Sequence, residues 1–338
     1  MAKKLNPEKI ISSLCEEGEV AQRLPSYELR QSQLDLLEMI IRSFNEDALL
    51  MAEAGTGVGK SFAYLLPAVN FALLNKEKVV ISTATITLQQ QLFEKDIPLV
   101  AAAIKADIKA VIIKGRGNYL CKRRLDDTLR EPPLDDYDYA ELKNISEWSG
   151  NTKTGDRSSL SFLPSETLWA SLCSESDLCM GLHCPWRESC FVFNLRKEAN
   201  GAHIIVVNHH LLFADLAARY QGAGYENSVI LPPFSRLVID EAHTIENAAT
   251  SFFSEQFSRN GIFHQLNRLF SQRTFKGKKR RTNKKGLLVK LCSFLPMDSS
   301  SLDNMADAIK KIRSCAEELD EYALQLCETD GVFRLSPS

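Results

Sequence analysis

Short apolar runs recur along the chain, and they predict buried strands. Five of them cover residues 48–52, 78–83, 110–114, 203–208 and 236–239. Runs of about four to eight apolar residues are typical of strands that are covered on both faces of a parallel sheet. Amphipathic stretches with helical spacing follow several of these runs, as at residues 62–68. The alternation predicts an α/β fold built on a parallel sheet.

A glycine-rich segment at residues 53–61 lies between the first apolar run and its helix. Glycines in such a turn let the backbone aim its N–H groups at a polyphosphate. The loop residues in question are Gly55, Thr56, Gly57 and Gly59. Lys60 would then reach the β- and γ-phosphates, and Ser61 would place its hydroxyl on a Mg²⁺ ion. Ala54 replaces the first glycine of the usual pattern, and a strand-to-helix turn without a ligand is the alternative.

Two adjacent carboxylates, Asp240 and Glu241, end the last apolar run. The carboxyl ends of parallel strands form the edge at which ligands bind. We expect Asp240 to hold Mg²⁺ through its outer sphere and Glu241 to orient and deprotonate the attacking water. The alternative is an ordinary helix N-cap and first turn.

These two motifs, Ala-Gly-Thr-Gly-Val-Gly-Lys-Ser and Asp-Glu-Ala-His, resemble motifs I and II of superfamily 2 helicases, in the branch that contains bacterial DinG and eukaryotic XPD. The resemblance implies a RecA-like P-loop NTPase that uses ATP and Mg²⁺ to move 5′ to 3′ on single-stranded DNA. It also implies that Arg30 and Gln33 lie beside the nucleotide and that Thr83, Thr87 and Gln89 contact the DNA backbone. Plain surface polarity and helix capping are the alternatives for these five side chains.

The segment between residues 114 and 203 is much longer than a crossover between neighbouring strands requires, so we expect an inserted subdomain. The spacing of its last cysteines is wide for a zinc knuckle and suits a larger iron–sulfur cluster, although zinc stays possible. The resemblance implies that the [4Fe–4S] ligands are Cys121, Cys179, Cys184 and Cys190. Cys173 is a fifth thiol that is either a bystander or a replacement for Cys179.

Two other parts of the insertion have a less definite pattern. Arg116 begins a basic stretch around Cys121 that suits a single DNA strand, or else a solvated helix face. Residues 131–165 are acidic and weakly patterned, and we expect most of them to form a surface loop.

The pattern changes to helices after His243, at residues 245–253, 261–270, 286–295 and 302–326, with a basic run at 273–285 that predicts an exposed loop. We expect a first RecA-like domain at 1–114 and 203–250, an iron–sulfur insertion at 115–202, and the beginning of a helical arch at 251–338. Too few residues follow for a second RecA-like domain, so we expect the front part of a helicase that turns over ATP poorly by itself.

Composition restricts the alternatives. The formal net charge is −2, so a nucleic-acid site must be a local patch. Neither a membrane-length apolar run nor a signal peptide is present, which predicts a cytoplasmic protein without a membrane partner. A catalytically incomplete protein that binds single-stranded nucleic acid or responds to redox state is the competing hypothesis; a small P-loop kinase is disfavoured. The sequence does not predict an oligomeric state.

Overall fold

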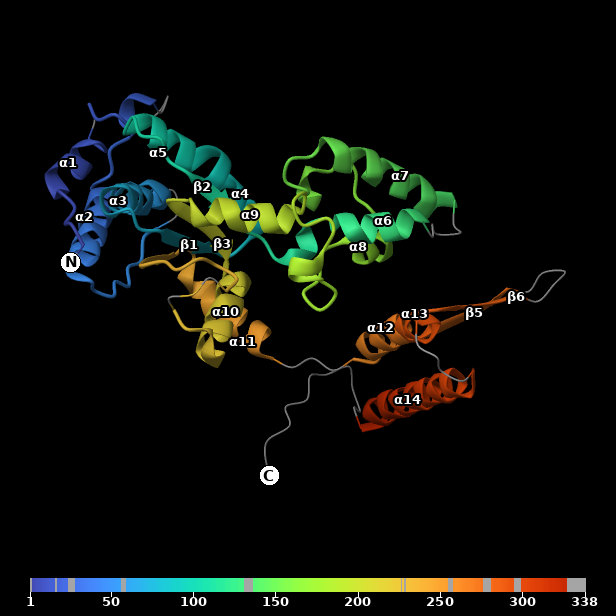
Figure 1. Cartoon of the computed structure of the whole chain (residues 1–338). Helices are drawn as coiled ribbons and strands as arrows, with labels where there is room; N and C mark the ends of the chain where they lie inside the picture. The colour runs from blue at the N-terminus through green and yellow to red at the C-terminus, as the bar shows by residue number, and fades with distance from the viewer. Residues whose placement is uncertain are drawn as a thin grey trace. The chain divides into compact units, whose positions relative to one another are not determined.

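The computed structural model describes residues 2–15, 17–23, 28–55, 59–130, 136–225, 227, 229–254, 258–275, 281–294 and 299–326. The chain divides into two compact units, Met1–Phe253 and Ser254–Ser338, and each is described by itself (Figure 1). No helix among the described residues combines the length and the apolar character that crossing a membrane would need.

The first unit is built on a parallel sheet with the strand order β2-β3-β1-β4. Its strands are β1 (Val79–Thr83), β2 (Ala110–Ile112), β3 (Ile204–Asn208) and β4 (Arg236–Ile239). Val80 lies opposite Ile205 on one side and Leu237 on the other. These strands coincide with four of the five apolar runs, so the prediction of an α/β fold with a parallel sheet is confirmed.

The remaining apolar run, the first in the sequence at residues 48–52, forms no strand, so the strand predicted there is wrong. Leu49 and Met51 are 99% and 94% exposed. Arg236 of β4 donates a hydrogen bond to the Phe44 carbonyl (3.2 Å) and pairs with Asp47. The end of the preceding helix is thus tied to β4, while the apolar residues after it have no partner strand and only Leu50 packs against the main core.

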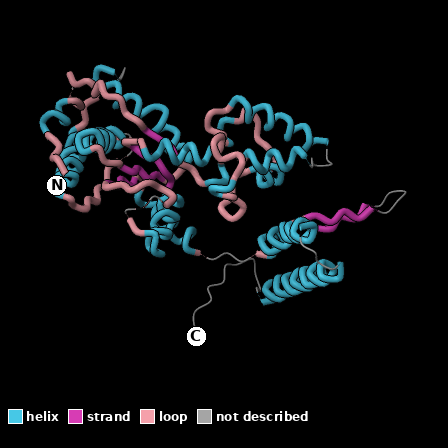
Figure 2. The backbone as a smooth tube through the Cα atoms, viewed as in Figure 1, coloured by secondary structure: helices cyan, strands magenta, loops and turns pink. Residues whose placement is uncertain are grey.

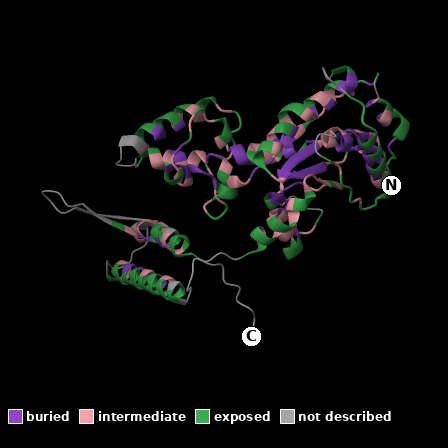
Figure 3. Cartoon of the chain, turned by 180° about the vertical axis from the view of Figure 1, so that it is seen from behind, coloured by how far each residue is buried: buried purple, intermediate pink, exposed green. Residues whose placement is uncertain are grey.

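Helices cover both faces of the sheet, whose two central strands, β1 and β3, are deeply buried (Figure 3). They are α1 (Pro7–Ser12), α2 (Gln31–Glu46), α3 (Lys60–Asn75), α4 (Ile86–Gln91), α5 (Ile97–Ala103), α9 (Phe191–Asn200), α10 (His209–Ala218) and α11 (Ile245–Phe253). Successive strand residues point to opposite faces. Val79 and Ile81 therefore pack in one core with α1, α2, α3 and α5, whereas Val80 packs in a second core with residues of α9 and α10.

The insertion has a small core of its own. Its helices are α6 (Lys122–Arg130), α7 (Asp136–Asn151) and α8 (Glu166–Leu172). The prediction of a surface loop fails at α7, because Leu142 and Ile145 are fully buried against the other helices. A buried ion pair between Lys114 and Asp156, 2.6 Å long, joins the end of β2 to the insertion.

The second unit contains α12 (Arg259–Leu269), α13 (Leu287–Phe294) and α14 (Ser299–Leu326). The helices predicted for this part of the chain are thus present. Residues 276–280 of the basic run lie outside the described residues. The rest of the run does not form the predicted loop, because it belongs to β5 (Ser271–Phe275) and β6 (Arg281–Lys285), which pair in antiparallel fashion (Figure 2). Hydrogen bonds between the two strands satisfy the backbone, and a composition rich in Lys and Arg does not reveal that pairing.

Candidate nucleotide site and cysteine cavity

The start of α3 and the carboxyl ends of β1 and β4 bring together four side chains that the sequence predicts as site residues. Lys60 Nζ lies 3.4 Å from Glu241 Oε1. The hydroxyl of Thr83 donates to Asp240 Oδ2 at 3.5 Å. The two motifs that the sequence places far apart therefore meet at one edge of the sheet.

Part of the predicted phosphate loop can be followed in detail. Thr56 and Gly57 lie outside the described residues, and Gly55 is exposed. Gly59 has a φ of +81° and caps α3, and a Cβ atom there would lie 2.3 Å from Nε2 of Gln33. Only glycine adopts this backbone conformation at that distance without strain.

Gln33 is buried, and its Nε2 donates to the Gly59 carbonyl at 2.9 Å. This hydrogen bond thus fixes the backbone of the phosphate loop at Gly59. Arg30 lies on the exposed side, at the N-cap of α2, and is 3.5 Å from Glu28. The predicted pair beside the nucleotide is therefore split into a buried support and an exposed cation.

Acidic groups gather around Ser61 and Asp240. Burial raises the pKa of Asp240, the neighbouring Glu241 raises it further, and Lys60 opposes both. Burial also raises the pKa of Tyr64, to which Asp240 adds, and the pKa of Asp96, which Ser61 counteracts. Buried acids close together favour a bound cation, because it would relieve both the desolvation and the repulsion.

Tyr64 and Asp96 are site residues that the sequence motifs do not include. Tyr64 follows Lys60 by one helical turn on α3, so its position was accessible to the i, i+4 rule. Asp96 ends the π-helical turn Leu92–Asp96 between α4 and α5, and no sequence signal marks it.

The turn after β4 is locally strained. Glu241 has a φ of +53°, a left-handed conformation that costs a residue with a Cβ atom about 1–2 kcal/mol. His209 lies beside this turn and contacts Ser82 through Nδ1 at 2.7 Å, and burial lowers its pKa. The ring therefore favours its neutral form, suited to a fixed hydrogen bond between β1 and the start of α10.

The predicted DNA contacts fall into two groups. Thr83 and Gln89 are fully buried, Thr83 against Asp240, and both amide atoms of Gln89 are buried without a hydrogen-bond partner among the described residues. A DNA phosphate cannot reach them in this structure, which removes both from the predicted contacts. Thr87 is exposed and Arg116 is half-buried, so these two stay accessible.

The four cysteines chosen from the sequence line one cavity of about 480 Å³. They are Cys121, Cys179, Cys184 and Cys190. Cys173 is not among the lining residues: it is buried in the core of the insertion, with its thiol 3.8 Å from the Ala170 carbonyl. The fifth thiol thus lies outside the cavity lining. Burial raises its pKa, and the thiol of Cys121 is near enough to raise it further.

The thiols of the cavity lie in a basic environment. The backbone N–H of Gly181 lowers the pKa of Cys179, and the guanidinium of Arg116 lowers it further. Arg196 lies near the thiols of Cys179 and Cys190. Burial has the opposite effect on Cys173, whose pKa is raised.

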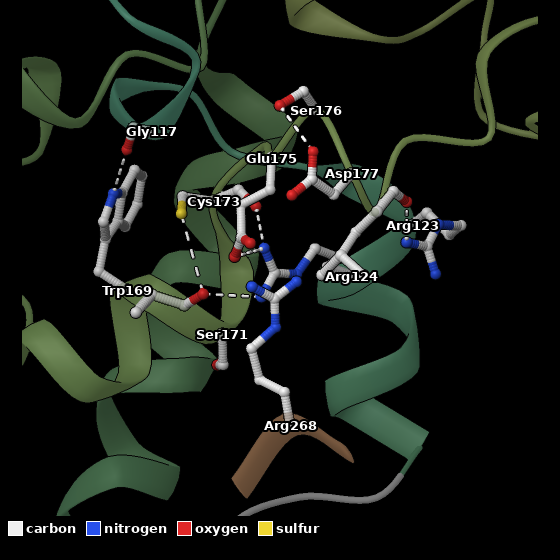
Figure 4. A network of polar contacts seen from close by, with 12 residues as sticks. Gly117, Arg123, Arg124, Trp169, Ser171, Cys173, Glu175, Ser176, Asp177 and Arg268 are labelled. Atoms are coloured by element: carbon white, nitrogen blue, oxygen red, sulfur yellow. Dashed lines mark hydrogen bonds and ion pairs between the residues drawn. The ribbon is translucent and has the colours of Figure 1, made fainter. Parts of the chain in front are cut away.

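Arg124 holds the segment that leads into Cys179 (Figure 4). Its guanidinium donates to the carbonyls of Cys173 (2.6 Å) and Ala170 (2.7 Å) and to the Glu175 carboxylate (2.6 Å). Arg123 donates to the Leu178 carbonyl at 2.9 Å. These two arginines brace the cavity wall and are less available to DNA than their sequence suggests.

The donor atoms around the cavity limit the kind of metal group that it can hold. Among the described residues, no three His, Cys, Asp or Glu side chains are close enough to hold a single ion. Four thiols spread around one cavity are instead compatible with a larger group that each contacts from a different side. The donor set, four thiols at one cavity, is thus of the kind that an iron–sulfur cluster uses.

Comparison with known proteins shows which helicases the chain resembles. The DEAD/DEAH box helicase family matches residues 31–127. The ATP-dependent DNA helicase YoaA of Haemophilus influenzae is 36% identical over 248 residues, which cover 73% of this chain and 38% of that relative. The ATP-dependent helicase DinG of Mycobacterium tuberculosis is 32% identical over 241 residues, 66% of this chain and 35% of that relative.

The chain is a relative of the DinG helicases. A solved XPD helicase also aligns over 87% of this chain and 48% of its own, with a TM-score of 0.36 and 14% identity, a likeness too distant to carry an argument. The DinG-like chain spans less than two fifths of the length of the two curated relatives. The residues that match the DEAD/DEAH box helicase family include Gln33, Lys60 and Cys121, whereas Asp240 and Glu241 lie outside the matched range.

Proposed function

We propose that this chain is the nucleotide-binding part of an ATP-dependent DNA helicase of the DinG type that moves on single-stranded DNA with 5′-to-3′ polarity. The observation that carries the proposal is the approach of Lys60 to Glu241 and of Thr83 to Asp240 at one edge of the sheet. A P-loop lysine beside two carboxylates is the arrangement that phosphoryl transfer requires, because catalysis there depends on positioning and charge.

Each side chain has a distinct part in the proposed reaction. Lys60 binds the β- and γ-phosphates once they displace Glu241, and Ser61 and Asp240 hold Mg²⁺. Glu241, released from Lys60, orients the attacking water and accepts its proton. Gln33 keeps the Gly59 carbonyl in place, which fixes the direction of the loop N–H groups. Arg30 is the exposed cation at the nucleotide side.

We further propose that Cys121, Cys179, Cys184 and Cys190 hold a [4Fe–4S] cluster in the cavity. A bound cluster would cross-link segments that are distant in sequence and so stabilise an insertion with a small core. Arg116 and Arg196 stabilise the thiolate forms that such ligands need. Thr87 and Arg116 are the accessible side chains that we assign to the DNA backbone.

Nucleotide binding tests the first proposal. Lys60→Ala should weaken binding of a fluorescent ATP analogue with Mg²⁺ by about 10- to 100-fold, since a hydrogen bond to a charged group contributes about 1.5–3 kcal/mol. Lys76→Ala, at the other end of α3, is the matched control. Equal binding by wild type and Lys60→Ala would refute the site.

The alternative is a protein that binds single-stranded nucleic acid without nucleotide chemistry, which the basic surroundings of the cysteine cavity favour. Nucleotide binding separates the two, when it is measured beside DNA affinity by fluorescence anisotropy with labelled single-stranded DNA. A motor fragment loses nucleotide binding in Lys60→Ala but keeps its DNA affinity, whereas the alternative shows no nucleotide binding in either protein.

Anaerobic purification tests the cluster. We expect a brown protein with a broad visible absorption band and about four irons per chain. Cys184→Ser should lose the band and Cys173→Ser should keep it, because Cys184 lines the cavity and Cys173 does not. A colourless protein that contains zinc would refute the cluster and leave the nucleotide site untouched.

A further inference from the structure

Helix α14 is apolar over a wider surface than its neighbours cover. On one side, Ala306 and Ile309 pack with Leu266 and Phe270 in the core of the second unit. Ala316, ten residues after Ala306, is buried on the same side. Among the apolar residues of the helix whose side chains the structure describes, only these three are buried.

A second apolar stripe, which we call the outer stripe, runs beside the buried face. Its members are Met305, Ala308, Ile312, Cys315, Leu319 and Tyr322, and all six are exposed. Ile312 and Leu319 are 49% and 52% exposed. The spacing alternates between three and four residues, which is the heptad spacing of a seam between two helices.

Charges flank the outer stripe on one edge only. Lys311 and Glu318, seven residues apart, occupy the same heptad position on that edge. The opposite edge carries the buried Ile309 and Ala316. In a parallel pair of such helices the charged edge would face the buried edge of the other copy. In an antiparallel pair the two charged edges face each other, so Lys311 of each copy lies opposite Glu318 of the other.

We propose that the outer stripe binds a second copy of this chain as an antiparallel helix pair. A two-fold axis near residues 313 and 314 makes the surface self-complementary, as an isologous interface requires. It places Leu319 opposite Ala308 and Tyr322 opposite Met305. Large side chains then meet smaller ones, which is the arrangement that fills a seam without voids.

Charge exchange tests the proposal on the full chain by sedimentation equilibrium over a range of protein concentrations. Wild type should dimerise. Lys311→Glu should raise the dissociation constant about tenfold, because two attractive contacts become repulsive. Lys311→Glu combined with Glu318→Lys should restore wild-type affinity. Lys310→Glu makes the same charge change away from the stripe and should leave the dimer unchanged.

Cross-linking tests the direction of the pair. The axis places Ile312 opposite Cys315 of the second copy, so Ile312→Cys should form a disulfide between positions 312 and 315 on oxidation, located by mass spectrometry of linked peptides. Ser314→Cys, on the polar side, should form none. A 315-to-315 link in wild type would refute the antiparallel direction. A monomeric wild type, or a dimer that none of the stripe variants alters, would refute the proposal, with circular dichroism showing that each variant is folded.

Discussion

The ammonium group of Lys60 lies 3.4 Å from a carboxylate oxygen of Glu241, although 181 residues separate the two in sequence. The contact joins the first residue of α3 to the strained turn after β4. Both side chains keep about a third of their surface exposed, at 31% and 30%. Phosphates can therefore reach Lys60 and compete with Glu241 for it.

Glu241→Gln should separate binding from hydrolysis. Without the carboxylate Lys60 is free to bind phosphate, and since a partly exposed ion pair contributes about 0.2–1 kcal/mol, nucleotide affinity should rise up to about fivefold. Loss of the general base should slow single-turnover hydrolysis by about 10²- to 10⁴-fold. Glu246→Gln, an exposed position on α11, is the matched control. Weaker nucleotide binding in Glu241→Gln would contradict the competition.

Asp96→Asn should stabilise the protein at neutral pH. Burial raises the pKa of Asp96, and one carboxylate oxygen has no hydrogen-bond partner among the described groups. The folded state therefore holds the proton more tightly than the unfolded state, so the contribution of Asp96 to stability is greatest below about pH 3.9 and is lost as pH rises through the folded pKa. Asparagine lacks this loss.

Urea unfolding at a series of pH values measures the effect. The difference between Asp96→Asn and wild type should be small near pH 4 and grow as the pH rises. Asp107→Asn, at an exposed position, serves as the control. A difference that shrinks with rising pH would show that the carboxylate is stabilised in the folded protein.

Lys114→Met should be strongly destabilising. Lys114 Nζ contacts Asp156 (2.6 Å) and Ser158 (2.9 Å), and the two charged side chains are 3% and 12% exposed. Removing one partner of a buried pair leaves a buried charge uncompensated and costs about 3–5 kcal/mol. Urea unfolding should show that loss, and Asp156→Leu added to Lys114→Met should recover part of it.

The exposed pair of Lys310 and Asp307 offers a contrast. It has a similar length, 2.7 Å, but its side chains are 66% and 65% exposed. Lys310→Met should destabilise the protein far less than Lys114→Met, because solvent screens the exposed pair. Equal losses in Lys114→Met and Lys310→Met would mean that burial does not govern the cost.

Cluster-free protein should show two classes of thiol. The Gly181 N–H and Arg116 lower the pKa of Cys179, whereas burial raises that of Cys173. In pulsed alkylation with iodoacetamide, read by mass spectrometry, Cys179 should reach half its maximal rate at a lower pH than Cys173. Arg116→Gln should move the Cys179 midpoint upward. An unchanged midpoint would exclude the guanidinium as a cause.

The sheet and its edge were predictable because their causes are local. The run at residues 203–208 predicts a strand buried on both sides, and Ile204 and Val207 are indeed fully buried in β3. The rule that the carboxyl ends of parallel strands share one edge then suffices to bring Asp240, after β4, beside Thr83 at the end of β1. Periodicity alone also located α11 (Ile245–Phe253).

The remaining features depend on tertiary partners. Leu49 belongs to a run as apolar as any strand, yet it is exposed, since burial requires a neighbour that the run does not specify. In α7 the polar residues outnumber the buried Leu142 and Ile145 and mask the helical pattern. Thr83 and Gln89 are hydrophilic in type, and only the packing around β1 and α4 shows that they point inward.

Helix α9 begins directly after Cys190, which is its N-cap residue. Near its other end, Ala199 packs in the core beneath β3. An uninterrupted helix of this length is a stiff rod of about 15 Å. This rigid helix joins Cys190 to the core beneath the strand that precedes His209. A displacement of Cys190 would therefore be transmitted along the helix to that strand, which couples the insertion mechanically to the sheet.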